Sequence, residues 1–413
     1  MIEDLSSLLE PEFYTRVLSF LWSLWPVILP IFLLSLGLNT WLSYKRREWI
    51  QNQGSVLLEI KLPREILKSP KAMEMVLEGI YEPASGNLGD AYLKGRVRDW
   101  FSLEIASLGG EIKFFIWALP KWKKTIEARI YSQYPGAEVF EVEDYMRPHV
   151  FDPNTMNLWG STIQLVKDDA YPIKTYVDYE LEKGNKEQEE IVDPIVSLIE
   201  YLGTIKEGEQ AWVQILIQAH RKEGLLDNRI IVKPDWKGKV KEEIKKIIEK
   251  ESHIKADEDK PATLQNLTTI QSETIDAIER NAVKPACDTM IRMVYFAPKD
   301  IFDGSRIGGM LGSMRPFGSH NLNGFKPKWM SGVDYPWKDF RDQRKIAGQK
   351  MHLDAFKRRS FFNVPYRHLN GKPFILTVEE LATIFHFPGT VATTPTLNRV
   401  PSKKAEAPAN LPL

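Results

Sequence analysis

Cationic and aromatic side chains alternate between Arg306 and Lys372, a combination of residue types that can bind nucleic acid. Basic side chains track phosphate groups, while aromatic rings stack on exposed bases. The cationic members are Arg306, Arg315, Lys326, Lys328, Lys338, Arg341, Arg344, Lys345, Lys350, Lys357, Arg358, Arg359, Arg367 and Lys372. The interleaved aromatic residues are Trp329, Tyr335, Trp337, Phe340, Phe356, Phe361, Phe362 and Tyr366. The pattern predicts contact with DNA, and the candidate residues are Arg341, Arg344, Lys345, Lys357, Arg358 and Arg359.

The same composition also has structural explanations. The aromatic rings can belong to a hydrophobic core, with the basic side chains as a solvated surface. The basic side chains can also meet the acidic region 180–209 of this chain. That region carries Glu180, Glu182, Glu187, Glu189, Glu190, Asp193, Glu200, Glu207 and Glu209. The sequence alone leaves these interpretations open.

Motifs typical of enzymes are absent from the sequence. Gly238-Lys239 and Gly371-Lys372 lack the earlier glycine and the following Ser or Thr of a phosphate-binding loop. The glycine-rich stretch 304–319 lacks the lysine and predicts a loop and a helix with close backbone packing. The seven histidines are scattered, so no local metal site is indicated. We therefore predict a non-enzymatic protein without a cofactor; the alternative is a tethered enzyme whose catalytic side chains converge only in the fold.

Composition restricts the class of protein further. The chain has 413 residues, 43% of them hydrophobic and 27% charged, which is typical of folded proteins with two or three domains. The formal net charge is zero, so any attraction to polyanions must come from local patches. Because Cys287 is the only cysteine, an internal disulfide is excluded.

The N-terminal region predicts a membrane helix. Residues 17–44 contain no charged side chain and exceed the roughly 20 apolar residues that a bilayer core requires. The aromatic side chains near the ends of this run are Trp22, Trp25, Trp41 and Tyr44. Lys45-Arg46-Arg47 follows it, which places residues 1–16 outside and the bulk of the chain in the cytoplasm. A cleaved signal peptide fits less well because the leading stretch is acidic, and a buried core helix is the remaining alternative.

The next regions predict an α+β protein. Residues 55–145 read as strand, helix, strand, strand, helix and strand, the order of a ferredoxin-like βαββαβ module. Gly109-Gly110 supplies the hairpin turn. Residues 155–325 predict a second, similar α+β module with a charged helical insertion at 236–260. We expect the basic aromatic-rich segment 326–372 to follow, and then a short helix and linker tail at 373–413.

Several stretches resemble a known family. They are LLEIKLPREILKSPKAMEMVLEGIY, FSLEIASLGGEIKFFI, IYSQYPGAEVFEVEDY, RIGGMLGSMRPFGSHNLNGFKP, LTVEELATIFHFPG and SKKAEAPANLP. Together they are similar to the membrane-anchored N-terminal region of bacterial type IV secretion and conjugative-transfer coupling ATPases of the hexameric DNA-pump class. In the longer relatives the last of these segments leads into a motor domain, which this sequence lacks.

This resemblance implies an adaptor in the bacterial plasma membrane that recruits or positions a separately encoded ATPase motor. It also implies a homo-oligomer, because the motors of the family are ring-shaped. We expect Leu381, Ile384 and Phe385 of the short C-terminal helix to dock on the motor. The competing hypothesis is a membrane-tethered protein that binds nucleic acid through 306–372.

Overall fold

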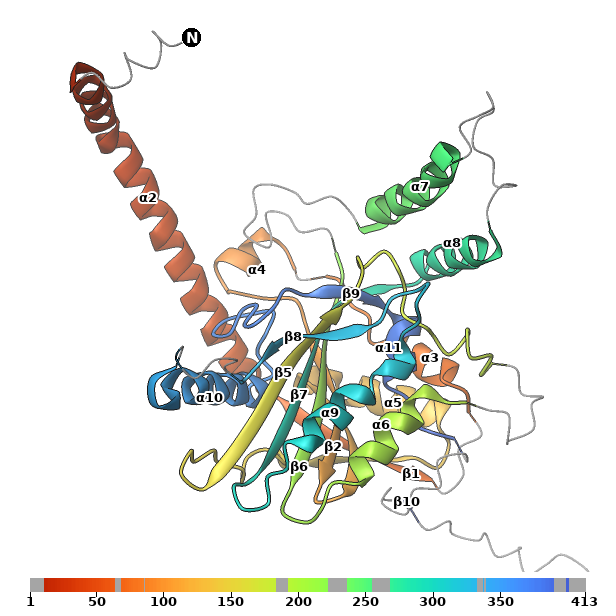
Figure 1. The fold of residues 1–413 in the computed structure, drawn as a ribbon. Helices are drawn as coiled ribbons and strands as arrows, with labels where there is room; N and C mark the ends of the chain where they lie inside the picture. Colours follow the sequence, from red (N-terminus) through yellow and green to blue (C-terminus); the bar gives the residue numbers. More distant parts are fainter. Residues whose placement is uncertain are drawn as a thin grey trace, which may run out of the picture. The chain divides into compact units, whose positions relative to one another are not determined.

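The computed structural model describes residues 11–63, 68–84, 86–182, 192–221, 236–254, 268–332, 337, 339–389 and 399–400 (Figure 1). Two compact units are present: one comprises 1–52 and 86–96, and the other comprises 53–85 and 97–413. The first unit is helical. The second contains an antiparallel sheet with helices, so the predicted α+β class with one long apolar N-terminal helix is confirmed.

The first unit consists of a long helix and a short one. Helix α2 (Pro11–Gln53) is longer than the predicted 17–44 and contains Pro26 and Pro30. Its part Trp22–Gln53 is long and apolar enough to cross a membrane, with a mean hydropathy of 1.6. Only 6% of this apolar stretch is buried, whereas the core helix of a soluble protein would be mostly buried. A signal sequence near the N-terminus would have the same length and apolar composition. Helix α4 (Leu88–Tyr92) is a short helix that the predicted order of elements for 55–145 did not include.

The second unit is built on a ten-stranded sheet. The strands are β1 (Val56–Pro63), β2 (Phe101–Leu108), β3 (Glu111–Ala118), β4 (Glu138–Val142), β5 (Met156–Leu165), β6 (Gln210–Ala219), β7 (Ala286–Pro298), β8 (Phe325–Met330), β9 (Phe374–Thr377) and β10 (Arg399–Val400). Among the described residues, β1 and β10 pair in parallel and the other strand pairs are antiparallel. The predicted hairpin between β2 and β3 is confirmed, and Gly109 and Gly110 adopt φ values of +64° and +96° that favour glycine.

The same strand order occurs twice in this sheet. The first four strands are arranged β4–β1–β3–β2, and the next four are arranged β8–β5–β7–β6. The two quartets meet where β2 pairs with β6, from Phe101 opposite Ile217 to Leu108 opposite Gln210. The connection between the second and third strands is a tight turn in the first quartet; in the second it contains α7 (Trp236–Ile254) and α8 (Thr269–Ala282). The strand order of the first quartet thus recurs in the second within one continuous sheet, while the division into two ferredoxin-like modules remains a prediction.

One face of the sheet is covered by helices (Figure 1). They are α3 (Lys71–Gly79), α5 (Lys123–Gln133), α6 (Pro194–Gly203), α9 (Ser305–Gly312) and α11 (Val378–Ile384), with the 3-10 turns η2 (Pro120–Trp122) and η6 (Arg315–Phe317). Because strand side chains alternate between faces, Leu58 and Ile60 join this core while Leu57 and Glu59 point the other way. The main hydrophobic core therefore lies between the sheet and these helices.

The opposite face is covered by α10 (Gln343–Lys357), which follows the turn η8 (Phe340–Asp342). Phe356 of α10 packs on Trp212 of β6, with ring centroids 5.9 Å apart. Helix α10 and all of strand β8 except its first residue, Phe325, lie within the predicted segment 326–372, so that segment is an integral part of the fold.

The short helix predicted after residue 373 is present as α11, and it is part of the main fold. Strand β9 pairs with β7, and α11 belongs to the main core. The last two described residues form β10 beside Leu62 and Pro63 of β1. The rest of the predicted linker tail, residues 390–398 and 401–413, lies outside the described residues, as do residues 1–10 and the insertion's end at 255–260.

Candidate functional site

A row of polar side chains crosses the face of the sheet that α10 covers. The strand register places Glu104 of β2 opposite Gln214 of β6, and Gln214 opposite Arg292 of β7. Arg292 lies in turn opposite Thr162 of β5. All four residues are buried, with exposed fractions of 0 to 1%. Polar residues in such a place require partners, because an unpaired buried charge is costly.

Arg359 provides the partner for Glu104. Its Nε donates to Glu104 Oε1 at 2.9 Å and its Nη2 donates to Oε2 at 3.1 Å. The same guanidinium donates from Nη1 and Nη2 to Asp144. The Tyr145 hydroxyl also donates to Glu104, and burial raises the pKa of that hydroxyl well above its ordinary value. This ion-pair cluster fixes the segments around residues 144 and 359 to the middle of the sheet.

Arg292 is held differently from Arg359. Its Nη2 donates to the backbone oxygen of Ser360 at 2.6 Å, and its guanidinium lies 5.5 Å from the Phe361 ring centroid. Burial lowers the pKa of Arg292 to about 9. Burial, and secondly the charge of Arg292, lower the pKa of His352 to about 3, so that its imidazole is neutral near pH 7.

The His352 ring fills the space that a side chain on β5 would take. It stacks on Trp329 with centroids 5.0 Å apart, and a Cβ on Gly160 would lie 2.4 Å from its Cδ2. The row from Glu104 to Thr162 is thus closed to solvent. Glu104 is engaged with Arg359 and Tyr145 of this chain. Among the described residues, Nη1 of Arg292 and Oε1 of Gln214 are buried without a hydrogen-bond partner, so the Arg292 side of the row is less completely satisfied than the Glu104 side.

The six residues predicted to contact nucleic acid differ in exposure and in their partners. Arg359 is only 2% exposed and is bound to Glu104 and Asp144, so its predicted role is wrong. Lys357 is half-buried, donates to the His149 backbone oxygen at 2.5 Å, and has a pKa lowered by burial. Arg358 is exposed and pairs with Asp354 at 2.8 Å.

The other three predicted residues gather at the start of α10. Asp339 accepts from the backbone N–H groups of Arg344 and Lys345 at 2.8 and 2.7 Å, and these two bonds lower the pKa of its carboxyl against the opposing effect of burial. These two bonds tie Asp339 to the first turn of α10. Arg341 adopts φ +54° and Asp342 φ +56°, a left-handed conformation that is uncommon for residues other than glycine.

This loop presents aromatic rings to solvent beside cations. Trp337 is 79% exposed and Phe340 is 76% exposed. The Arg341 guanidinium lies 5.1 Å from the Phe340 ring centroid, and Arg344 is also exposed. We call Trp337, Phe340, Arg341 and Arg344 the aromatic–basic surface. In this surface, exposed aromatic rings and exposed cations of the predicted stretch occur together.

The predicted motor-docking residues are buried in this chain's own core. Leu381 and Phe385 are 0% exposed and Ile384 is 1% exposed. The Phe385 ring packs edge-on against Phe114 of β3, with centroids 5.8 Å apart. The predicted docking role is therefore wrong, because these side chains have no surface to offer to a partner.

Polar bonds fix α11 in place as well. Thr377 caps its N-terminus, and Glu380 accepts from the backbone N–H of Ile173 at 2.9 Å and from Asn281 at 3.0 Å. Glu379 accepts from Arg280 at 3.2 Å. Burial raises the pKa of Glu380 to about 7.

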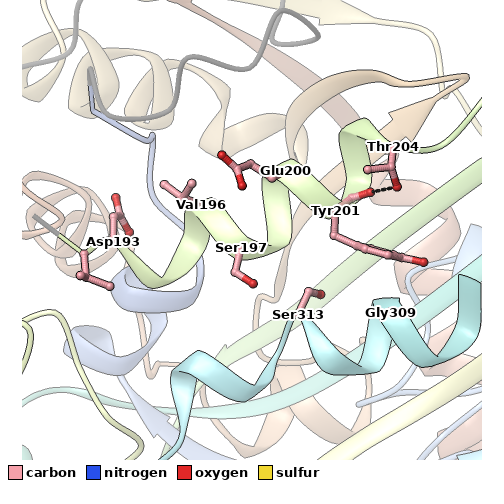
Figure 2. Close-up of a pocket in the computed structure, with 9 residues that line it drawn as sticks. Asp193, Val196, Ser197, Glu200, Tyr201, Thr204, Gly309 and Ser313 are labelled. Atoms are coloured by element: carbon pink, nitrogen blue, oxygen red, sulfur yellow. Dashed lines mark hydrogen bonds between the residues drawn. The ribbon is translucent and has the colours of Figure 1, made fainter. Parts of the chain in front are cut away.

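A surface groove of about 560 Å³ lies between α6 and α9 (Figure 2). It is lined by Val192, Asp193, Val196, Ser197, Glu200, Tyr201, Thr204, Gly309 and Ser313. Gly309 is required there because a Cβ would lie 2.2 Å from the Tyr201 ring. Asp193 bonds to Nε2 of His386 at 3.0 Å, so the acid at one end of the groove is already engaged.

Sequence reasoning missed both the groove and the polar row. The two helices that line the groove, α6 and α9, lie about a hundred residues apart along the chain, so no local pattern connects them. Among the described residues, no group of three or more His, Cys, Asp or Glu side chains is placed to hold a metal ion.

The sequence matches the model of a family described as "Domain of unknown function (DUF8128)" over residues 38–399. The chain belongs to DUF8128. The matched region of this DUF8128 protein begins within α2 and includes the sheet, the polar row, the groove and the aromatic–basic surface. No curated protein matches the chain.

Proposed function

We propose that this DUF8128 protein is a non-enzymatic, membrane-anchored adaptor. The proposal rests on the helix Trp22–Gln53. Its apolar stretch is long enough to cross a membrane, and only 6% of that stretch is buried within the protein. Leu34 is 65% exposed and Ile31 is 63% exposed. Side chains of this kind are unfavourable in water, by roughly 25 cal/mol for each Å² of apolar surface, and a bilayer removes that cost.

Details of α2 support a lipid environment. Ser35 and Thr40 donate to the carbonyl oxygens of Phe32 and Leu36, each at 2.8 Å, so their hydroxyls are satisfied within the helix. Such internal bonding is what a helix in hydrocarbon requires. Lys45-Arg46-Arg47 at its end supports a single span with the N-terminus outside and the sheet unit in the cytoplasm.

The finer part of the proposal rests on the resemblance to coupling ATPases. The adaptor would sit in the bacterial plasma membrane, form a homo-oligomer and position a separately encoded ATPase motor. Its two quartets of strands would be ferredoxin-like modules. Because Leu381, Ile384 and Phe385 are buried, the motor would contact an exposed feature, for which the aromatic–basic surface is the best candidate.

Co-purification tests this adaptor function. The tagged full-length protein is extracted in mild detergent and its partners are identified by mass spectrometry. We expect a protein with the G-x-x-x-x-G-K-[ST] motif, and we expect Trp337→Ala with Phe340→Ala to lose it. If no such protein is recovered from an intact complex, motor recruitment is contradicted. If the double variant retains the motor fully, contact through the aromatic–basic surface is contradicted.

A second candidate function is nucleic-acid binding. It is favoured by the exposure of Trp337 and Phe340 beside Arg341 and Arg344, which fits base stacking with phosphate contacts. We expect single-stranded DNA to bind with an affinity that falls steeply with salt, and Arg341→Glu with Arg344→Glu to weaken binding and flatten the salt slope. Arg358→Glu is the matched control, because Arg358 is exposed but pairs with Asp354. Equal binding by the wild type and the double variant would eliminate this function.

A further inference from the structure

The segment 86–96 packs against the C-terminal part of α2 within the first unit. The indole N–H of Trp41 donates to the backbone oxygen of Tyr92 at 3.4 Å. Gly95, at φ +71°, lies so close that a Cβ would be 2.4 Å from the carbonyl carbon of Lys45. Backbone therefore meets backbone at this point, which ties the segment to residues 41–46 of the helix.

This segment has a defined local structure and exposes apolar side chains. Asn87 and Asp90 form a capping box at the start of α4, and Asp90 pairs with Lys94 at 2.8 Å. Leu88 nevertheless remains 51% exposed and Leu93 69% exposed. These two leucines therefore leave apolar side chains of this segment available to an apolar surface.

The position of the segment along α2 indicates what that surface is. About 20 residues span the hydrocarbon core, and the 20 residues before Trp41 are free of charge. Trp41 and Tyr44 then lie at the level of the lipid headgroups, followed by Lys45-Arg46-Arg47. Because segment 86–96 is attached between residues 41 and 46, its leucines lie at the same level.

We propose that segment 86–96 is an interfacial anchor that inserts Leu88 and Leu93 into the surface of a bilayer containing anionic lipid. Lys94 and Arg47, both exposed, would lie beside the lipid phosphates. This inference rests on the proposed function, since it requires α2 to span the membrane. A bilayer is favoured over a protein partner because the segment contacts α2 at Trp41 and Lys45, where the apolar run ends and the cations Lys45-Arg46-Arg47 follow.

Site-directed fluorescence in the full-length protein tests this anchor. Leu88→Cys, Leu93→Cys, Leu34→Cys and the control Val283→Cys are labelled singly with an environment-sensitive dye. The native Cys287 stays unlabelled because it is buried and its thiol pKa is raised by burial. The labelled proteins are reconstituted in nanodiscs whose lipids carry bromine near the headgroup or near the chain end, with and without phosphatidylglycerol.

We expect dyes at 88 and 93 to be quenched by the headgroup-proximal bromines, more strongly with phosphatidylglycerol, and the dye at 34 by the deep bromines. Val283, which is 76% exposed on the sheet unit, serves as the unquenched comparison. Quenching at 34 without quenching at 88 and 93 overturns the anchor and leaves the membrane span intact. Quenching at 283 equal to that at 88 and 93 overturns the anchor as well. Absence of quenching at 34 removes the proposed span and the anchor with it.

Discussion

Replacing Arg359 by Met should destabilise the sheet unit far more than the same change at its neighbour Arg358. Arg359 and Glu104 have side chains that are 3% and 0% exposed. Removing one partner of such a pair leaves a buried carboxylate without its countercharge, which costs about 3–5 kcal/mol. Ser102, Gln214 and Tyr145 still donate to Glu104, so we expect the lower end of that range.

Arg358→Met is the matched control because the residue type is the same and the environment is opposite. Arg358 forms an ion pair with Asp354, and the two side chains are 58% and 41% exposed, respectively. Exposed pairs of this kind contribute about 0.2–1 kcal/mol. The two variants should therefore differ by about 2 kcal/mol or more in the free energy of unfolding.

The assay is urea unfolding of the full-length protein in detergent, followed by tryptophan fluorescence. A lower midpoint at an unchanged slope reports lost stability. A second variant, Arg359→Met with Glu104→Gln, removes the stranded charge and should regain part of the loss. Equal midpoints for Arg358→Met and Arg359→Met would refute the assignment of Arg359 to a buried cluster.

Three further predictions concern stability. Phe385→Ala should lower the free energy of unfolding by about 3–5 kcal/mol, since the ring is 0% exposed, and an unchanged urea midpoint would show that α11 is not a core element. Gly160→Ala should cost about 1–3 kcal/mol because His352 occupies the space of the new methyl group, measurable in the same assay. Glu380 keeps its proton in the folded state up to a pKa of about 7, against an ordinary 4.5, so the folded state binds more protons than the unfolded state between these values. Its contribution to the free energy of unfolding therefore rises by about 3 kcal/mol as the pH falls from 7 to 4.5. Glu380→Gln should remove that part of the pH dependence. Parallel pH profiles of unfolding free energy for the wild type and Glu380→Gln would contradict this prediction.

The sequence predicted elements well where the periodicity was local. The Gly109-Gly110 turn and, apart from the additional α4, the order of strands and helices predicted for 55–145 are found in the structure. Strand β9 has only four residues, too few for a period, and its pairing with β7 depends on a stretch far along the chain. The sequence therefore could not show that α11 enters the core.

The candidate site was predictable only in part, for a related reason. Arg358 and Arg359 are adjacent and chemically identical, and only the path of the chain makes one exposed and the other buried. Glu104 lies 255 residues from Arg359, so no sequence spacing connects them. The sequence shows that cations and aromatic residues alternate in 306–372. Which of the rings are accessible depends on the fold: Trp337 and Phe340 are exposed, whereas Phe356 and Phe361 are buried.

Alkaline carbonate extraction of membranes that contain the full-length protein, followed by intact-mass measurement, tests the membrane anchor most directly. If α2 spans the bilayer, the protein stays in the membrane pellet with its full mass of 47.6 kDa. Release into the supernatant, or a shorter chain that has lost the apolar helix, would contradict the anchor and favour a cleaved signal sequence.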